Sequence, residues 1–303
     1  MASITLAEAS KLTTDLIVQG VIENIVTVNP IYQLLPFDEI DGNSLRYNRE
    51  KTLGDAQQLA IGGTITAKAA ATYKKKNADL TTMIGDAEVN GLIQAQKVGG
   101  DQVAQQISSK AKTISRLYQN KMINGDSVNP DEFDGLDAII DEIVTDGDNP
   151  DQSIAAGGAL SFTLLDEVCQ QVKAKDGMVD YIMMNGKQML ALKNAYRALG
   201  GTTGEWVTLA NGENVLAYNG VPVFRNDWIT VDTGASSIYA GCFDDGSQKL
   251  GMAGLTTTTN MGIHVQNVGA SETKDEDIFR VKFYSGFVVY NELGIARLTG
   301  VTE

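Results

Sequence analysis

The residues that most often carry catalysis or bind metals are few and widely separated in this sequence. The single histidine, His264, lies in the alternating segment MGIHVQNV. One imidazole cannot supply both a catalytic triad and a metal cluster, so we interpret His264 as a strand residue that is packed or solvated. None of the motifs G-x-S-x-G, H-E-x-x-H and G-x-x-x-x-G-K-[ST] occurs. We therefore assign no catalytic residue and do not expect an enzyme.

The two cysteines, Cys169 and Cys242, lack C-x-x-C spacing, which indicates neither a zinc knuckle nor a disulfide framework. Cys169 follows Val168 on the apolar side of a predicted helix, so we interpret it as a small buried hydrophobe rather than a nucleophile. The expected compartment is reducing.

Carboxylates gather in two stretches, DSVNPDEFDGLD (126–137) and DGDNPD (146–151), and in the pair Asp244-Asp245. Their spacing could hold calcium, yet neither stretch matches the D-x-[DN]-x-[DN]-G-x5-E loop. We interpret them as solvated loops and surface acids, and we expect neither a metal nor another cofactor. The run Lys74-Lys75-Lys76 is typical of a solvated face, although in a shell protein it could meet an acidic neighbour.

Charge and composition limit the class of protein. The 303 residues include 38 acidic and 24 basic side chains, and the formal net charge of −14 argues against sequence-specific DNA binding. The hydrophobic share of 43% suffices for one large domain or two modest ones. No window approaches the ~18 consecutive apolar residues of a membrane-spanning helix, and MASITLAEAS is not a secretion signal. We expect neither a membrane protein nor one secreted by that route.

The elements that must position the side chains begin with an amphipathic helix over 14–28, followed by a hairpin. Apolar residues, including Ile17, Val21 and Ile25, recur at helical spacing until Asn-Pro at 29–30 ends the helix. The next stretch has strand-like pieces and several glycines but no long apolar periodicity, which predicts an extended hairpin with a pliable tip. Its few apolar residues could not form a core of their own and would need a neighbour; they include Leu59, Ile61 and Ile65.

A long amphipathic helix is predicted after Gly99-Gly100. Asp101 can cap it, and at 1.5 Å per residue it is ~35 Å long if it runs to about Ile123. Its apolar stripe consists of Val103, Ile107, Ala111, Ile114, Leu117 and Met122. The segment EVNGLIQAQ before the helix reads as a strand, and the turn-rich and polar stretch 124–159 after it reads as loop, so we place a subdomain boundary there.

From Ser161 the pattern alternates between helix and strand, which indicates a compact α/β unit. Asn185 is positioned to cap the helix GKQMLALKNAYRALGG, which follows the strand VDYIMM. The helix before that strand is predicted from Leu164, Leu165, Val168 and Val172. Strand-like segments continue from NVLAYNGVPVFRND to the C-terminus.

This order of elements resembles the major capsid proteins of tailed bacteriophages with the Hong Kong 97 fold. Three passages carry the resemblance: LLPFDEIDGNSLRYNRE before the hairpin, FDGLDAI after the long helix, and DYIMMNGKQMLALKNAYRALG with NGVPVFRND. The closing FRVKFYSGFVVYNELGIARLTGV is similar to the family's final strand passage. The resemblance covers essentially the whole chain and implies an α+β fold. The implied parts are an N-terminal arm (1–40), an extended E-loop (41–82), a peripheral domain with the spine helix (83–127 and 256–303) and an α/β axial domain (128–255).

The implied function is that of a structural subunit that self-assembles as pentamers and hexamers into an icosahedral or prolate head around the phage genome. Arm and hairpin would lie across neighbours, and we predict inter-subunit contacts at Ile17, Val21, Ile25, Leu59, Ile61 and Ile65. One sequence must fit several quasi-equivalent positions, and the predicted hinges are Gly62, Gly63, Gly99 and Gly100. Ordinary turn glycines are the alternative interpretation of these four positions.

The resemblance also implies partners and a location. The chain would associate with itself, a portal and, as a further candidate, a decoration protein, and it would enclose double-stranded DNA in the virion after assembly in the host cytoplasm. Many relatives begin with a removable scaffolding segment, whereas this sequence enters the arm almost at once, so we expect a separate scaffolding protein. Some relatives are cross-linked by Lys-Asn isopeptide bonds, but no such set of residues can be aligned here.

Two other interpretations remain open. An encapsulin, a bacterial compartment of the same fold, would enclose protein cargo instead of a genome. An α/β enzyme or ligand-binding protein centred on residues 160–245 would need a pocket with convergent polar groups.

Overall fold

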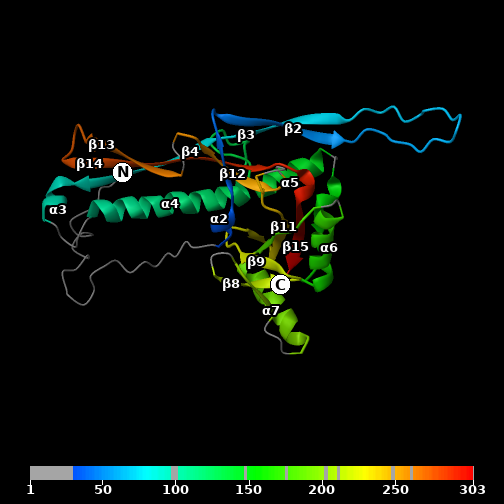
Figure 1. Ribbon diagram of the computed structural model, residues 1–303. Coiled ribbons are helices and arrows are strands. Elements are labelled where there is room, and N and C mark those ends of the chain that lie inside the picture. Colours follow the sequence, from blue (N-terminus) through cyan, green and yellow to red (C-terminus); the bar gives the residue numbers. More distant parts are fainter. Residues whose placement is uncertain are drawn as a thin grey trace.

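This computed structural model contains two β-sheets, helices that pack on them and a projecting hairpin (Figure 1). It describes residues 30–96, 102–146, 149–174, 177–200, 204–209, 212–246, 250–259 and 262–302. The helix predicted over 14–28 lies outside the described residues. So do Asp101 and five of the predicted contact and hinge residues, namely Ile17, Val21, Ile25, Gly99 and Gly100.

The first sheet has five strands organised by β14 (Glu276–Val289). The strand β4 (Thr81–Asn90) pairs antiparallel with β14 along one side, from Glu276 opposite Asn90 to Ser285 opposite Thr81. On the other side, β13 (Ile263–Ala270) and β12 (Met252–Thr257) follow one another, both antiparallel to β14. The short β1 (Phe37–Ile40) pairs parallel with β12 and continues from the helix α2 (Pro30–Leu34).

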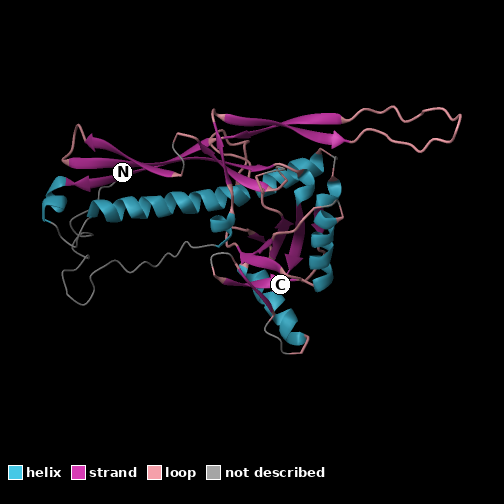
Figure 2. Cartoon of the chain, in the orientation of Figure 1, coloured by secondary structure: helices cyan, strands magenta, loops and turns pink. Residues whose placement is uncertain are grey.

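The helix α4 (Gln102–Asn124) lies along this sheet and contacts β4 and β14, which confirms the predicted long helix (Figures 1 and 2). Its buried stripe contains Ile114, Tyr118 and Met122, spaced by four residues so that they share one face. The predicted stripe was wrong at Leu117, which is 42% exposed. Tyr118 takes the core position instead. Successive residues of a helix are about 100° apart, so Leu117 and Tyr118 lie on opposite sides of the line through Ile114, and the side of Tyr118 faces the core.

The second sheet has eight strands in the order β5-β15-β11-β6-β9-β8-β7, with β10 paired to β11. The pairs β5–β15 and β6–β9 are parallel and the others antiparallel. The strands are β5 (Ser153–Ala155), β6 (Tyr181–Met184), β7 (Glu205–Thr208), β8 (Asn214–Tyr218), β9 (Val221–Arg225), β10 (Val231–Asp232), β11 (Ala235–Gly241) and β15 (Ile295–Thr302).

Helices cover the second sheet. The helices α6 (Phe162–Lys173) and α7 (Gly186–Ala198) share a hydrophobic core with one face, and α7 starts as predicted, because the Asn185 side chain accepts a hydrogen bond from the Lys187 amide at 3.1 Å. The other face contributes Tyr181 and Tyr239 to a core that also contains residues of α4, α5 (Leu136–Thr145) and the first sheet. Because one core joins both sheets, the body of the molecule is a single packed unit.

Two predictions of local structure were wrong. Residues 91–96 of EVNGLIQAQ form the helix α3 (Gly91–Gln96) rather than continuing β4. Residues 136–145, read as connection and loop, form α5, whose Leu136, Ile140 and Ile143 are buried on one face. The neighbouring glycine and aspartates are typical of loops, so the short helical spacing of these three apolar residues was not recognised. Short 3₁₀ turns complete the structure at η1 (Pro150–Gln152) and η2 (Glu292–Gly294).

The hairpin β2 (Ser44–Thr52) and β3 (Thr72–Asp79) projects from the body as an antiparallel ribbon (Figure 1). The chain between the two strands continues outward as an extended loop with a turn at its end. This matches the hairpin predicted from the sequence.

Candidate inter-subunit surfaces

The tip of the hairpin carries apolar side chains that have no core to enter. Ile61 at the apex is fully exposed, while Leu59 is 49% and Ile65 58% exposed. The Gly63 amide donates to the Ala60 carbonyl at 2.9 Å, and the intervening Gly62 has φ +84°, a value that favours glycine. The predicted contact residues therefore lie at the exposed tip of the hairpin, with Ile61 in the turn and Leu59 and Ile65 on either side of it, and Gly62 meets an ordinary turn requirement. A hinge role for Gly62 and Gly63 stays a prediction.

One glutamine organises the tip. The Gln57 Oε1 atom accepts from the backbone amides of Thr66 at 2.8 Å and Ala67 at 2.7 Å, and its amide nitrogen donates to the Thr64 carbonyl at 3.1 Å. These bonds connect the two sides of the loop beyond the last paired residues of the strands. The tip thus has a defined conformation although its apex is exposed among the described residues.

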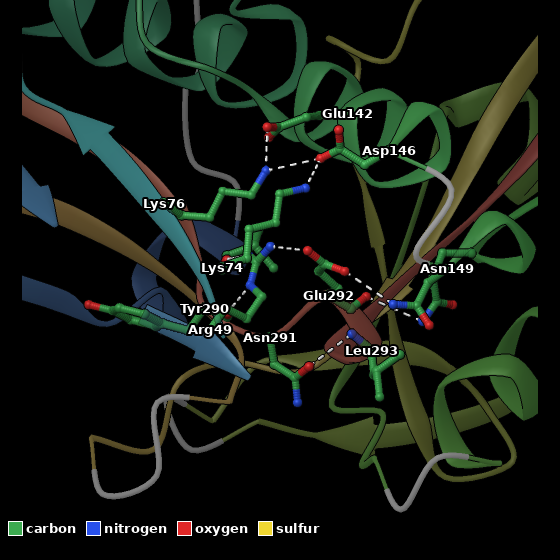
Figure 3. Close-up of polar contacts among 12 residues, drawn as sticks. Arg49, Lys74, Lys76, Glu142, Asp146, Asn149, Tyr290, Asn291, Glu292 and Leu293 are labelled. Carbon is green, nitrogen blue, oxygen red and sulfur yellow. Dashed lines mark hydrogen bonds and ion pairs between the residues drawn. The ribbon is translucent and has the colours of Figure 1, made fainter. Parts of the chain in front are cut away.

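The root of the hairpin is fixed by Arg49 (Figure 3). Its guanidinium donates to the carbonyl oxygens of Val289 and Tyr290, both at 2.8 Å, and pairs with the carboxylate of Glu292. Both charged side chains are largely buried. Glu292 also accepts from Asn149 at 3.1 Å, so the same carboxylate joins the hairpin to the segment that precedes β5. Such a buried pair with additional hydrogen bonds holds its partners in a defined geometry.

Two tyrosines and a small apolar core also hold the root of the hairpin. The rings of Tyr47 and Tyr290 meet edge to face at 5.5 Å, and the Tyr47 hydroxyl donates to the Val289 carbonyl at 3.2 Å. Tyr290 in turn donates to Asp38; burial, and then this hydrogen bond, raise the pKa of Tyr290. A small core of Ile40, Ala253, Leu255, Val288 and Tyr290 underlies the hairpin residues Leu45, Tyr47, Ala78 and Leu80.

The lysine run makes contacts within the subunit instead of forming a wholly solvated face. Lys74 pairs with Asp146, and Lys76 pairs with Glu142 and, at 3.4 Å, with Asp146 (Figure 3). Lys75 points to the opposite side of the strand and is exposed, as the alternation of a β-strand requires. The hydrogen bond from Lys74, more than any other cause, lowers the pKa of Asp146. The end of α5 is therefore a second attachment point for the hairpin.

The sequence indicated neither the Arg49–Glu292 pair nor the acidic partners of the lysines. Arg49 and Glu292 are 243 positions apart. The one feature of the sequence that could have indicated the inward position of Arg49 is the alternation in SLRYNREKT, which places Leu45, Tyr47 and Arg49 on one face of the strand.

The residues considered for chemistry lie apart from one another. Cys169 and Cys242 are buried and unpaired, and burial raises the pKa of each thiol to about 11, which disfavours the reactive thiolate. His264 lies on the exposed strand β13. Among the described residues, no three His, Cys, Asp or Glu side chains gather as a metal ion requires. In the same part of the chain, no helix is long and apolar enough to span a membrane.

Within residues 160–245, a shallow cavity of about 510 Å³ lies beside α6. One of the carboxylates that line it, Asp166, accepts hydrogen bonds from the Tyr218 hydroxyl at 2.8 Å and the Asn219 amide at 3.1 Å. These polar groups bind each other instead of converging on the cavity. The arrangement favours a surface feature over the ligand-binding interpretation.

Comparison with known proteins decides between the interpretations. The family model described as SU10 major capsid protein matches residues 18–218. The chain belongs to this family. No curated protein matches the sequence.

Solved structures agree with this capsid protein in fold. The capsid of a native GTA particle is similar with a TM-score of 0.66 and 14% identity, covering 100% of both chains. A structure of Microbacterium phage Oxtober96 has a TM-score of 0.63 and 12% identity, again covering 100% of both chains. The holo-SrpI encapsulin complex from Synechococcus elongatus PCC 7942 has a TM-score of 0.74 and 17% identity over 99% of this chain and 97% of that chain. The α+β architecture is therefore the Hong Kong 97-type capsid fold, and the protein is a structural component of the virion.

Proposed function

We propose that this major capsid protein builds the phage head as pentamers and hexamers that close into an icosahedral or prolate shell. One observation carries the proposal: the hairpin is fixed to the body at its root, yet it presents Leu59, Ile61 and Ile65 to solvent at its tip. A fixed arm with an apolar end suits contact with a neighbour, because burying apolar surface gains roughly 25 cal/mol per Å². Many such modest contacts close a shell when the rotations between subunits close.

The parts of the molecule take distinct roles in this proposal. Residues 1–40 act as an arm on a neighbouring subunit and 41–82 as the E-loop. We assign residues 83–127 and 256–303 to the peripheral domain and 128–255 to the axial domain that surrounds the fivefold and sixfold positions. Within 256–303, β15 pairs with β11 and β5 of the second sheet. The hinges at Gly62, Gly63, Gly99 and Gly100 adapt one sequence to these different environments.

The tip is tested by the double variant Ile61→Asp/Ile65→Asp. We expect a folded subunit that no longer forms shells in electron micrographs, because two carboxylates would have to lose their water in the contact. Val128→Asp is the matched control, since Val128 is exposed on the body of the subunit and its variant should still assemble. Shells of normal yield from the double variant would contradict the role of the tip.

The arm is tested separately by removing residues 1–28, which include Ile17, Val21 and Ile25. We expect capsomers or incomplete shells in place of closed ones. Unchanged assembly would contradict an inter-subunit role for these three side chains.

The proposed partners are a separate scaffolding protein, a portal and, as a further candidate, a decoration protein. Assembly would take place in the host cytoplasm, and the shell would enclose double-stranded DNA without sequence-specific binding, in keeping with a net charge of −14. Co-expression with the scaffolding gene and analysis of nucleic acid in the purified particles test these assignments.

An encapsulin-type compartment was the alternative interpretation of the sequence, and the SrpI encapsulin shares the fold of this chain at 17% identity. The family match supports the phage head instead. The contents of particles purified from their natural source separate the two: DNA indicates a head, and a single enclosed protein indicates a compartment.

A further inference from the structure

The helix α5 carries acidic side chains and no basic one. Asp137, Asp141 and Glu142 lie within it, and Asp146 is its C-terminal cap. Side chains four residues apart are neighbours on the surface of a helix, and like charges at this spacing repel each other. Asp137 and Asp141 form one such pair, and Glu142 and Asp146 form a second. The second pair also meets the negative end of the helix dipole. The helix therefore depends on cations from other parts of the chain.

The first carboxylate pair is bridged from the second sheet. The Arg297 guanidinium donates to Asp137 at 3.0 Å and also to Asp141, and its side chain is only 10% exposed. Arg297 lies in β15 between its cross-strand neighbours Ser153 of β5 and Tyr239 of β11. The Tyr239 hydroxyl donates to Asp137 as well. This flank of α5 is thus attached to a row of polar side chains that crosses the sheet.

The second carboxylate pair is bridged from the hairpin. Lys76 of β3 pairs with both Glu142 and Asp146, and Lys74 adds a second cation at Asp146 (Figure 3). Successive helix residues are about 100° apart, so the two carboxylate pairs lie on opposite flanks of the buried stripe of α5. Figure 1 shows α5 between the hairpin and the strands β11 and β15. Each flank therefore binds the part of the chain that supplies its cation.

The two flanks belong to one short helix and are not independent. The helix α5 has ten residues, and a helix shorter than ~12 residues is marginal unless contacts outside it hold it in place. Helix formation is cooperative, so the loss of the last turn also weakens the turn before it. Removal of the cations on the hairpin side should therefore weaken the attachment on the sheet side.

We propose that α5 is an electrostatic coupling element, which links the attachment of the hairpin to the attachment of α5 on the second sheet. When Lys74 and Lys76 leave their carboxylates, the repulsion on that flank loosens the helix and its contact with Arg297. The coupling is reciprocal, because linkage between two sites acts with the same free energy in both directions. A movement of the hairpin is in this way transmitted to β11 and β15. The inference concerns the single subunit and goes beyond its assembly into a shell.

The test measures amide hydrogen exchange in full-length wild-type and variant proteins at pH 7, in the same assembly state as verified by light scattering. In Lys74→Met/Lys76→Met we expect the amides of residues 139–141 to exchange at least about threefold faster, relative to the amides of α6, which report global unfolding. Lys75→Met is the matched control, since Lys75 is exposed on the other face of the same strand and its removal should leave these amides unchanged. If the double variant does not fold, Lys76→Met alone makes the same test, because Lys76 contacts both carboxylates.

A further substitution separates charge from packing. Glu142→Gln in the double variant removes the repulsion with Asp146 without returning the lysines. It should slow the exchange of residues 139–141 toward the wild-type rate while β3 stays loosened. Unchanged exchange of these amides in the lysine variants would overturn the coupling, because the two attachments would then be independent. Fast exchange that Glu142→Gln does not reduce would also overturn it, because the effect would then come from lost packing.

Discussion

The guanidinium of Arg49 joins segments of the chain that are far apart in sequence. It reaches the carbonyl groups at the end of β14, and its partner Glu292 lies in the turn η2 and also binds Asn149. A charged pair that is removed from water is sensitive to the loss of one member, because the other is left buried and unpaired. Arg49 is therefore the charged anchor of the hairpin, beside the Tyr47–Tyr290 contact and the lysine pairs with the end of α5.

Arg49→Ala should lower the free energy of unfolding of the unassembled subunit by about 3 kcal/mol, because it strands the Glu292 carboxylate. Urea unfolding measures the loss. Arg46→Ala is the control, since Arg46 is exposed on the other face of the same strand and its removal should cost no more than about 0.5 kcal/mol. Pairing Arg49→Met with Glu292→Gln should restore much of the lost stability. Equal effects of the Arg46 and Arg49 variants would contradict the assigned anchor.

The contact between Lys74 and Asp146 should depend on pH. Its hydrogen bond lowers the pKa of Asp146 in the folded protein, with Lys76 and Glu142 as the other charged groups at this site. A lowered carboxyl pKa contributes stability that is present above the unfolded value of about 4 and is lost as the pH falls through the folded value. Hydrogen exchange in β3, corrected for its intrinsic pH dependence, should become faster below about pH 4. Asp146→Asn should show the faster exchange already at pH 7, and no difference from wild type would contradict the attachment.

At the scale of elements, the long helix α4 has one face buried in the core and one face exposed to solvent. Ile114→Ala should destabilise the subunit by about 3 kcal/mol, because it opens a cavity in the shared core. Leu117→Ala, the matched change on the same helix, should cost less than about 1 kcal/mol, since this side chain is already 42% exposed. Denaturant unfolding of both variants measures the loss in the free energy of unfolding. Comparable losses would show that the buried face of α4 is wrongly assigned.

Elements with a sustained period or a local capping signal could be predicted from the sequence. The long helix and the Asn185 cap of α7 are examples, because neighbouring residues alone determine them. The helix α5 could not, since its three buried side chains lie among residues that are typical of loops. The Arg49–Glu292 anchor depends on packing between distant segments, and local pattern does not report such packing.

At the scale of the whole molecule, one core joins the two sheets, while the hairpin tip stays outside it. The body can therefore fold as a unit and retain an apolar extension for a neighbour. Exposed apolar surface in a soluble subunit is a liability unless a partner covers it. The chain belongs to a capsid protein family. In the proposed assembly a neighbouring subunit covers the tip, which would explain why the surface is kept.

The most direct test of the assembly account is the mass and shape of the purified wild-type protein, alone and with a candidate scaffolding protein. Size-exclusion chromatography with light scattering gives the mass, and negative-stain electron microscopy gives the shape. The account predicts ring-shaped capsomers or closed shells in at least one of the two samples. A stable monomer of 32.4 kDa in both would contradict it and would direct attention to the cavity beside α6.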